Sequence, residues 1–153
     1  MATLKPFLNA GFLHQLERCV AGDDHPTSWP AALRKILLID DEDAQPAPAA
    51  SHLIHLLHAR MSVLQAAFNT EQVANELRRY QKFAKPGQPS PHIVQLRRQQ
   101  AAARQASSQS LQSLVKHATA FMRAATIELP AKMALEPFIN QWLDASLPKE
   151  VAQ

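Results

Sequence analysis

The chain has 153 residues, a length that suits one domain with a single core, and 46% of the residues are hydrophobic. Its lone cysteine excludes an internal disulfide and favours a reducing compartment, and it contains no run of about 18 apolar residues that would indicate a membrane span. Only three glycines occur, whereas the helix-forming residues Ala, Leu and Gln are abundant. We therefore predict an all-α cytoplasmic protein without membrane contact, in which residues 1–153 form one domain of about five to seven helices and no sheet.

Positive charge is concentrated in one part of the chain. Residues 77–127 hold nine Lys and Arg residues and no Asp or Glu, whereas the residues before them hold five basic and nine acidic residues. The formal net charge of +3 is thus the balance of +9 in this segment, −4 before it and −2 after it. Such segregation predicts an anionic partner.

Two short helices are predicted in the N-terminal third of the chain. Apolar residues recur at helical spacing from Phe7 to Val20, and Gly22 with the polar residues after it ends this first helix. A second apolar series runs from Trp29 to Ile39 and leads into the acidic residues 40–43. The second helix is therefore expected to end in this acidic run.

The segment 34–43, with the sequence RKILLIDDED, resembles the first strand and acidic pocket of response-regulator receivers. That resemblance implies parallel strands, a phosphate-accepting Asp after the third strand and a Lys after the fifth. No Asp occurs between Asp43 and Asp144, so the chain lacks the acceptor. The carboxylates at 40–43 could hold a hard cation such as Mg²⁺, or they could form a solvated helix end. We predict the solvated helix end and no bound metal.

Residues 44–50, composed mainly of Ala and Pro, are predicted to form an extended connector within the domain. Ser51 is a candidate cap for a third helix. Asn69, with Gln72 three residues later, resembles a capping box that would begin a fourth helix. The sequence therefore predicts two successive helices between Ser51 and Ala84.

Three histidines, His52, His55 and His58, lie on the polar side of the third predicted helix. A pair spaced by three residues could share a metal ion. However, successive members of this series drift around the helix, and the general-base Glu of the HExxH motif is absent. We predict a solvated face that carries no metal.

The strongest break in the chain is the Pro-rich loop at 85–91, after which one long helix is predicted to run from Pro91 to about residue 125. Its second half, from Leu111 onward, keeps the apolar spacing of a helix that packs in a core. Its first half, residues 97–110, contains only Arg, Gln, Ala and Ser, so we expect it to be exposed, packed through alanines or covered by a partner. A last helix is expected to begin at Pro137, followed by a tail at 148–153.

Motifs of catalysis are missing from this sequence. It has no glycine-rich nucleotide loop, no GxSxG, no CxxC and no HExxH. We therefore predict that the protein is not an enzyme, has no catalytic residues and needs no cofactor.

Two functions fit the basic segment. Lys and Arg neutralise phosphates, and Gln and Ser donate hydrogen bonds to the nucleic-acid backbone. We therefore expect a nucleic-acid-binding protein, or a subunit of a nucleoprotein assembly, that contacts phosphates through residues 77–127. The alternative is a protein-interaction module, such as an adaptor, secretion-type chaperone or inhibitor, that binds an acidic protein. Both are compatible with self-association or a larger complex. The candidate binding residues are Arg78, Arg79, Lys82, Lys85, Arg97, Arg98 and Arg104.

Overall fold

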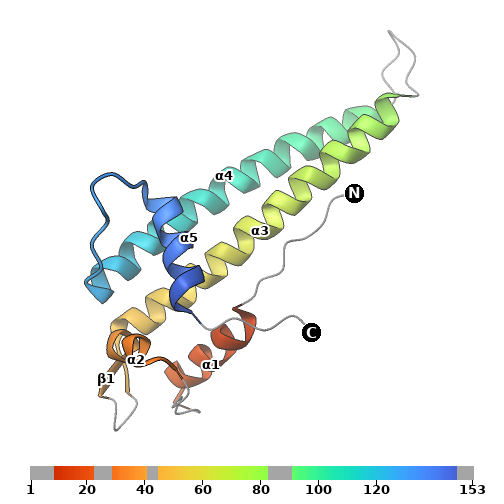
Figure 1. Ribbon diagram of the computed structural model, residues 1–153. Coiled ribbons are helices and arrows are strands. Elements are labelled where there is room, and N and C mark those ends of the chain that lie inside the picture. The colour runs from red at the N-terminus through yellow and green to blue at the C-terminus, as the bar shows by residue number, and fades with distance from the viewer. Residues whose placement is uncertain (1–8, 23–28, 41–44, 83–90, 148–153) are drawn as a thin grey trace.

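The computed structural model describes residues 9–22, 29–40, 45–82 and 91–147. Within these ranges the fold is all-α, as predicted, and contains five helices and one short pair of strands (Figure 1). The elements in chain order are α1 (Ala10–Val20), α2 (Ala31–Leu37), β1 (Leu38–Asp40), β2 (Gln45–Pro46), α3 (Pro48–Gln81), α4 (Pro91–Ala125) and α5 (Leu135–Ser146).

A long antiparallel hairpin of α3 and α4 organises the molecule. These helices contain 34 and 35 residues, so each is about 50 Å long at 1.5 Å per residue. The three short helices gather around one end of the hairpin, which we call the base (Figure 1). Toward the other end α3 and α4 continue as a pair, and we call residues 66–82 and 91–110 the distal half.

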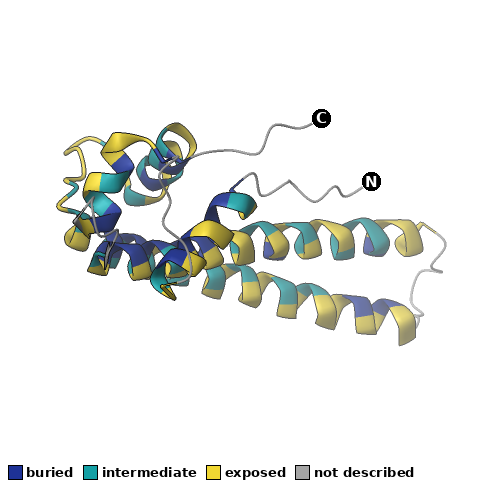
Figure 2. Ribbon diagram, turned by 90° about the horizontal axis from the view of Figure 1, so that it is seen from below, coloured by how far each residue is buried: buried dark blue, intermediate teal, exposed yellow. Residues whose placement is uncertain are grey.

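The main hydrophobic core lies in the base. Leu16 of α1, Leu33 of α2 and Ile139 of α5 join the buried faces of α3 and α4 in one cluster. Figure 2 shows the buried residues concentrated there. The two tryptophans both pack on phenylalanine rings: Trp29 on Phe12 and Trp142 on Phe121, with ring centroids 5.1 and 5.3 Å apart.

The two helices predicted between Ser51 and Ala84 form the single helix α3, so the break predicted at Asn69 is wrong. The Asn69 side chain does not cap a helix, because its Oδ1 accepts a hydrogen bond from Gln65 Nε2 at 3.0 Å. Thr70 Oγ1 donates to the Ala66 carbonyl one turn earlier, at 2.8 Å. Packing against α4 along its whole length outweighs a weak local capping signal.

The second predicted helix also ends earlier than expected. It stops at Leu37, and the next three residues form β1, which pairs antiparallel with β2. The backbone N–H of Ala47 donates to the Leu37 carbonyl at 2.7 Å and closes this turn. The prediction of no sheet therefore missed a two-stranded ribbon.

The connector predicted at 44–50 is shorter than expected, because α3 begins at Pro48. Proline suits the first turn of a helix, where its missing N–H would have no partner in any case. The acidic residues 41–43, residues 85–90 of the Pro-rich loop and the tail at 148–153 lie outside the described residues.

Helix α4 ends in a Schellman motif. The N–H of Ile127 donates to the Met122 carbonyl at 2.9 Å, and the N–H of Thr126 donates to the Arg123 carbonyl at 3.3 Å. Thr126 has a φ of 59°, in the left-handed region that glycine usually occupies. The chain therefore turns toward α5 through a β-branched residue in a strained conformation.

Candidate functional site

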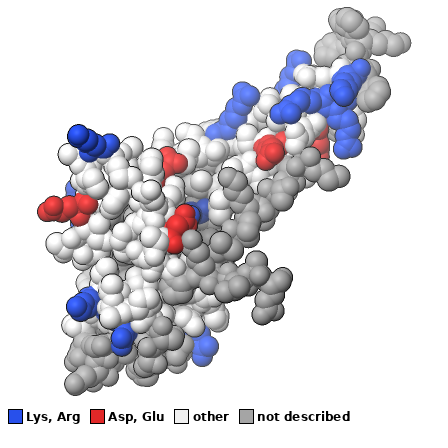
Figure 3. Space-filling model, viewed as in Figure 1, with Lys and Arg blue, Asp and Glu red and all other residues white. Residues whose placement is uncertain are grey.

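The candidate binding residues lie in the distal half of the hairpin. The structure describes six of the seven, and all six are exposed; Lys85 lies outside the described residues. Figure 3 shows Lys and Arg side chains gathered at this end of the molecule. We call the six residues the distal cations: Arg78, Arg79 and Lys82 at the end of α3, and Arg97, Arg98 and Arg104 on α4.

A small buried cluster fixes the orientation of these side chains. Leu77 of α3 packs with Ile93 and Leu96 of α4, and the three form a core separate from that of the base. Because Leu77 and Leu96 face the opposite helix, the two residues that follow each of them must point outward. Those residues are Arg78 and Arg79 on α3, and Arg97 and Arg98 on α4.

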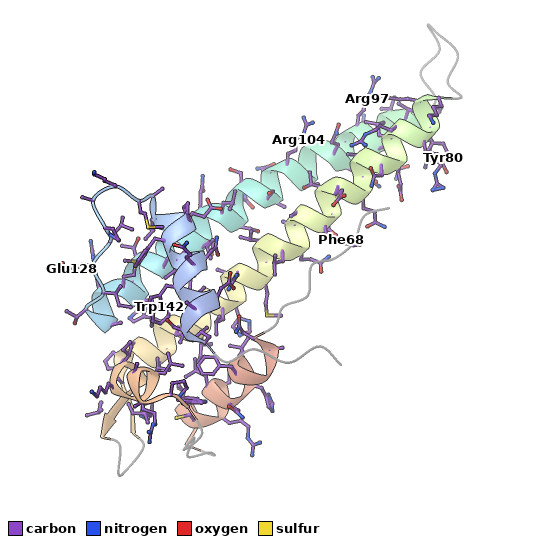
Figure 4. The ribbon with its side chains drawn as sticks, viewed as in Figure 1. Phe68, Tyr80, Arg97, Arg104, Glu128 and Trp142 are labelled. Atoms are coloured by element: carbon purple, nitrogen blue, oxygen red, sulfur yellow. The ribbon has the colours of Figure 1, made fainter. Side chains whose placement is uncertain are left out.

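Four of the distal cations lie on one side of the hairpin. Arg78 and Lys82 are one turn apart on α3, and Arg97 and Arg104 are seven residues apart on α4, which places them within about 20° of each other. Figure 4 shows Arg97 and Arg104 projecting from α4.

The opposite side of the distal end carries an aromatic contact between Tyr80 and His92, whose ring centroids are 4.3 Å apart. Arg78 and Lys82 are each two residues from Tyr80, which turns them about 160° away from it on the helix. Arg97 lies about 140° around α4 from His92 by the same geometry. The end of the hairpin therefore has a cationic side and an aromatic side.

Few carboxylates accompany the distal cations. Glu71 and Glu76 are the only acidic residues of the distal half as the structure describes it. No carboxylate of the described residues lies within ion-pair distance of any distal cation. In the base, by contrast, Arg60 Nη2 pairs with Asp144 Oδ1 at 2.8 Å, and His58 Nε2 lies 3.1 Å from Glu17 Oε1.

The distal cations contribute little to folding. The helix dipole favours Arg78 and Arg79 at the C-terminal end of α3, but it gives no such benefit to Arg97 and Arg98 near the N-terminal end of α4. Like charges one turn apart, such as Arg78 and Lys82, weaken a helix by a few tenths of a kcal/mol. Stability therefore does not account for the accumulation of cations at this end.

The middle of the hairpin is joined through small side chains. Thr70 Oγ1 lies 3.4 Å from the Ala103 carbonyl of the facing helix, and Ala66 is buried. The alanine packing considered for residues 97–110 thus occurs on one side of α4, while much of the segment is exposed. A groove of about 430 Å³ runs beside this contact and is lined by Ser62, Gln65, Ala66, Asn69, Ala102, Ala103, Ala106 and Ser110.

The histidine-bearing face of α3 meets a fourth histidine. His55 and His58 are exposed, as predicted, whereas His52 is partly buried. The ring of His55 stacks on His117 of α4. The position of His117 next to this group could not be predicted, because the register between α3 and α4 is not visible in the sequence. In the described part of the chain, no three His, Cys, Asp or Glu side chains are arranged to hold a metal ion.

Partial burial lowers the pKa of His117 below its ordinary value of 6.5. The positive charges that His55, Lys116 and His52 can carry lower it further, in decreasing order of effect. A proton on His117 is therefore disfavoured in the folded chain.

Comparisons with known proteins yield no relative: no protein-family model matches the chain, and no curated protein or solved structure is significantly similar to it. Among the described helices, none combines the length and the apolar character needed to cross a membrane. Function must therefore be inferred from the chain's own residues.

Proposed function

We propose that the protein is a non-enzymatic nucleic-acid-binding protein, or a subunit of a nucleoprotein assembly, that contacts phosphate groups through the distal cations. The observation that supports this most is the accumulation of six exposed cations, without carboxylate partners among the described residues, at one end of the hairpin. Phosphate groups bound here would relieve the repulsion between these side chains. The side chains would in turn displace the counterions bound to the nucleic acid.

The neighbouring side chains suit contacts to a nucleic-acid backbone. Gln95, Gln99 and Gln105 are exposed on the same half of α4 and can donate hydrogen bonds to phosphate or sugar oxygens. Contacts of this kind give affinity and orientation, but they do not distinguish one base sequence from another. We therefore propose binding that depends strongly on salt and weakly on sequence.

The alternative is a protein-interaction module, such as an adaptor, secretion-type chaperone or inhibitor, because an acidic protein would be attracted by the same cations. A salt titration separates the two functions. Binding of the purified chain to fluorescently labelled duplex DNA, single-stranded DNA and RNA is followed by anisotropy as salt is raised. Nucleic-acid binding predicts a linear fall of log K against log salt. Absence of binding to all three at low salt would refute the proposal and favour the acidic protein partner.

A further inference from the structure

Tyr80 is an aromatic side chain displayed to solvent beside the distal cations. It is 44% exposed, and every other Phe, Tyr and Trp residue that the structure describes is buried or partly buried. Figure 4 places it at the far end of α3, on the opposite side of the hairpin from Arg97 and Arg104. Burial in the core therefore does not explain an aromatic residue at this position.

The ring of Tyr80 is held in place but is not covered by its neighbour. Its contact with His92 is edge-to-face, with ring planes at 74°. In this arrangement one ring turns its edge toward a face of the other, so at least one face of Tyr80 is not covered by His92. Since the contact joins the ends of α3 and α4, the ring is fixed relative to the distal cations.

The charges around Tyr80 separate a side suited to phosphates from a side suited to bases. Arg78 and Lys82 lie on the far side of α3, and Arg79 lies about 100° around the helix from Tyr80. Glu76 precedes Tyr80 by one turn and lies near its side of the helix. The carboxylate of Glu76 would repel a phosphate next to the ring, but it would not repel the uncharged face of a base.

We propose that the distal end of the hairpin binds single-stranded nucleic acid, with one base stacked on Tyr80 and phosphates farther along the strand on the distal cations. This inference rests on the proposed function. A single strand is flexible and can turn a base outward onto an aromatic ring, whereas the bases of a duplex are stacked inside it. Stacking on an aromatic ring accepts any base, which agrees with contacts that carry no sequence.

The test compares two strands of equal length and charge: a labelled oligothymidine and a strand in which every base is replaced by an abasic sugar. The full chain should bind oligothymidine roughly 5- to 150-fold more tightly, the range expected for one stacked base. The same comparison between oligouridine and its abasic counterpart shows whether the stacked strand is DNA or RNA. A preference within either pair supports the inference.

Variants attribute the preference to the ring. Tyr80→Ala should abolish the preference for strands with bases and leave binding of the abasic strand unchanged, whereas Tyr80→Phe should keep both. Met61→Ala, which removes an exposed apolar side chain far from this end, is the matched control and should behave as the wild type. Equal binding of the two strands by the wild type would overturn this inference and leave phosphate contacts intact. Failure to bind any strand would overturn the proposed function as well.

Discussion

The imidazole rings of His55 and His117 stack across the interface between α3 and α4, with centroids 5.4 Å apart and planes inclined by 25°. Two rings that can each carry a proton thus face one another where the hairpin enters the base. Lys116 precedes His117, and His52 lies one turn before His55, so further positive charge surrounds the pair.

This stack predicts that acid weakens the fold. The pKa of His117 is lowered in the folded chain, so the unfolded chain takes up its proton first as the pH falls below about 6.5. The stability associated with the neutral ring is therefore present above that pH and lost below it. We expect His117→Gln to reduce the fall in urea midpoint between pH 7.5 and about 5.5, relative to the wild type. Gln112→Ala, at an exposed position of the same helix without a titratable group, provides the control and should leave the fall unchanged.

The separation of the two cores predicts different costs for the same substitution. Leu114 is fully buried in the base, and Leu114→Ala should lower the free energy of unfolding by about 3 to 5 kcal/mol. Leu77 belongs to the three-residue distal cluster and is 8% exposed, so Leu77→Ala should cost at most about 2 kcal/mol. Urea unfolding followed by circular dichroism measures both. An equal loss of unfolding free energy in the two variants would contradict this prediction, because it would mean that the distal cluster stabilises the fold as much as the core of the base.

Helix content and the location of the core could be predicted from the sequence, because both depend on periodic apolar residues. Leu53 and Leu57 of α3 and Leu114 of α4 are buried as their spacing indicates, whereas Val115 in the same apolar series of α4 is exposed. Outward positions for Arg78 and Arg97 also follow from helical geometry. The stack of His55 on His117 and the contact of Tyr80 with His92 could not be predicted, because each depends on the register between two helices.

Element ends depend on how strong the local signal is. The predicted bounds of α4 are confirmed, because Pro91 begins a helix clearly and the apolar spacing stops near Ala125. Asn69 and Gln72 have the spacing of a capping box, but a local signal worth about 1 kcal/mol does not interrupt a helix that packs along a partner. The left-handed turn at Thr126 could not be predicted, because no glycine or asparagine marks it.

Thr126 therefore offers a stabilising substitution. Its left-handed φ strains a β-branched residue and suits glycine, although glycine also loses more conformational entropy on folding. We expect Thr126→Gly to raise the free energy of unfolding by about 0.5 to 1 kcal/mol, seen as a higher melting temperature. Ala124→Gly, inside the last turn of the same helix, should instead destabilise by a similar amount. A lower melting temperature for Thr126→Gly would contradict the left-handed turn.

Asn69 tests whether α3 is one helix or two. If Asn69 capped a separate helix, Asn69→Ala would cost about 1 kcal/mol. Inside a continuous helix the same change removes only the side-chain bond from Gln65 and gains helix propensity, so we expect stability to stay within about 0.5 kcal/mol. Asn69→Pro should be strongly destabilising in the continuous helix, by about 3 kcal/mol. Urea unfolding of both variants distinguishes the two structures.

The distal cations provide the decisive prediction for the proposed function. Arg97→Ala combined with Arg104→Ala removes two exposed charges from one side of the distal end. If each arginine binds a phosphate, affinity should fall for every sequence alike. The negative slope of log K against log salt should become shallower by about 0.7 to 0.9 for each phosphate no longer neutralised. The melting temperature should not change, because neither side chain has an ion-pair partner among the described residues.

The matched control removes the same number of charges from the same helix at the base, through Lys116→Ala combined with Arg123→Ala. Both side chains are exposed there, so the net charge falls equally while the distal end is left intact. A general effect of protein charge would weaken binding in both double variants by the same factor. Binding at the distal end predicts that the slope of log K against log salt becomes shallower only for the variant of Arg97 and Arg104. The reason is that the number of released counterions depends on the number of neutralised phosphates and not on the overall charge of the protein.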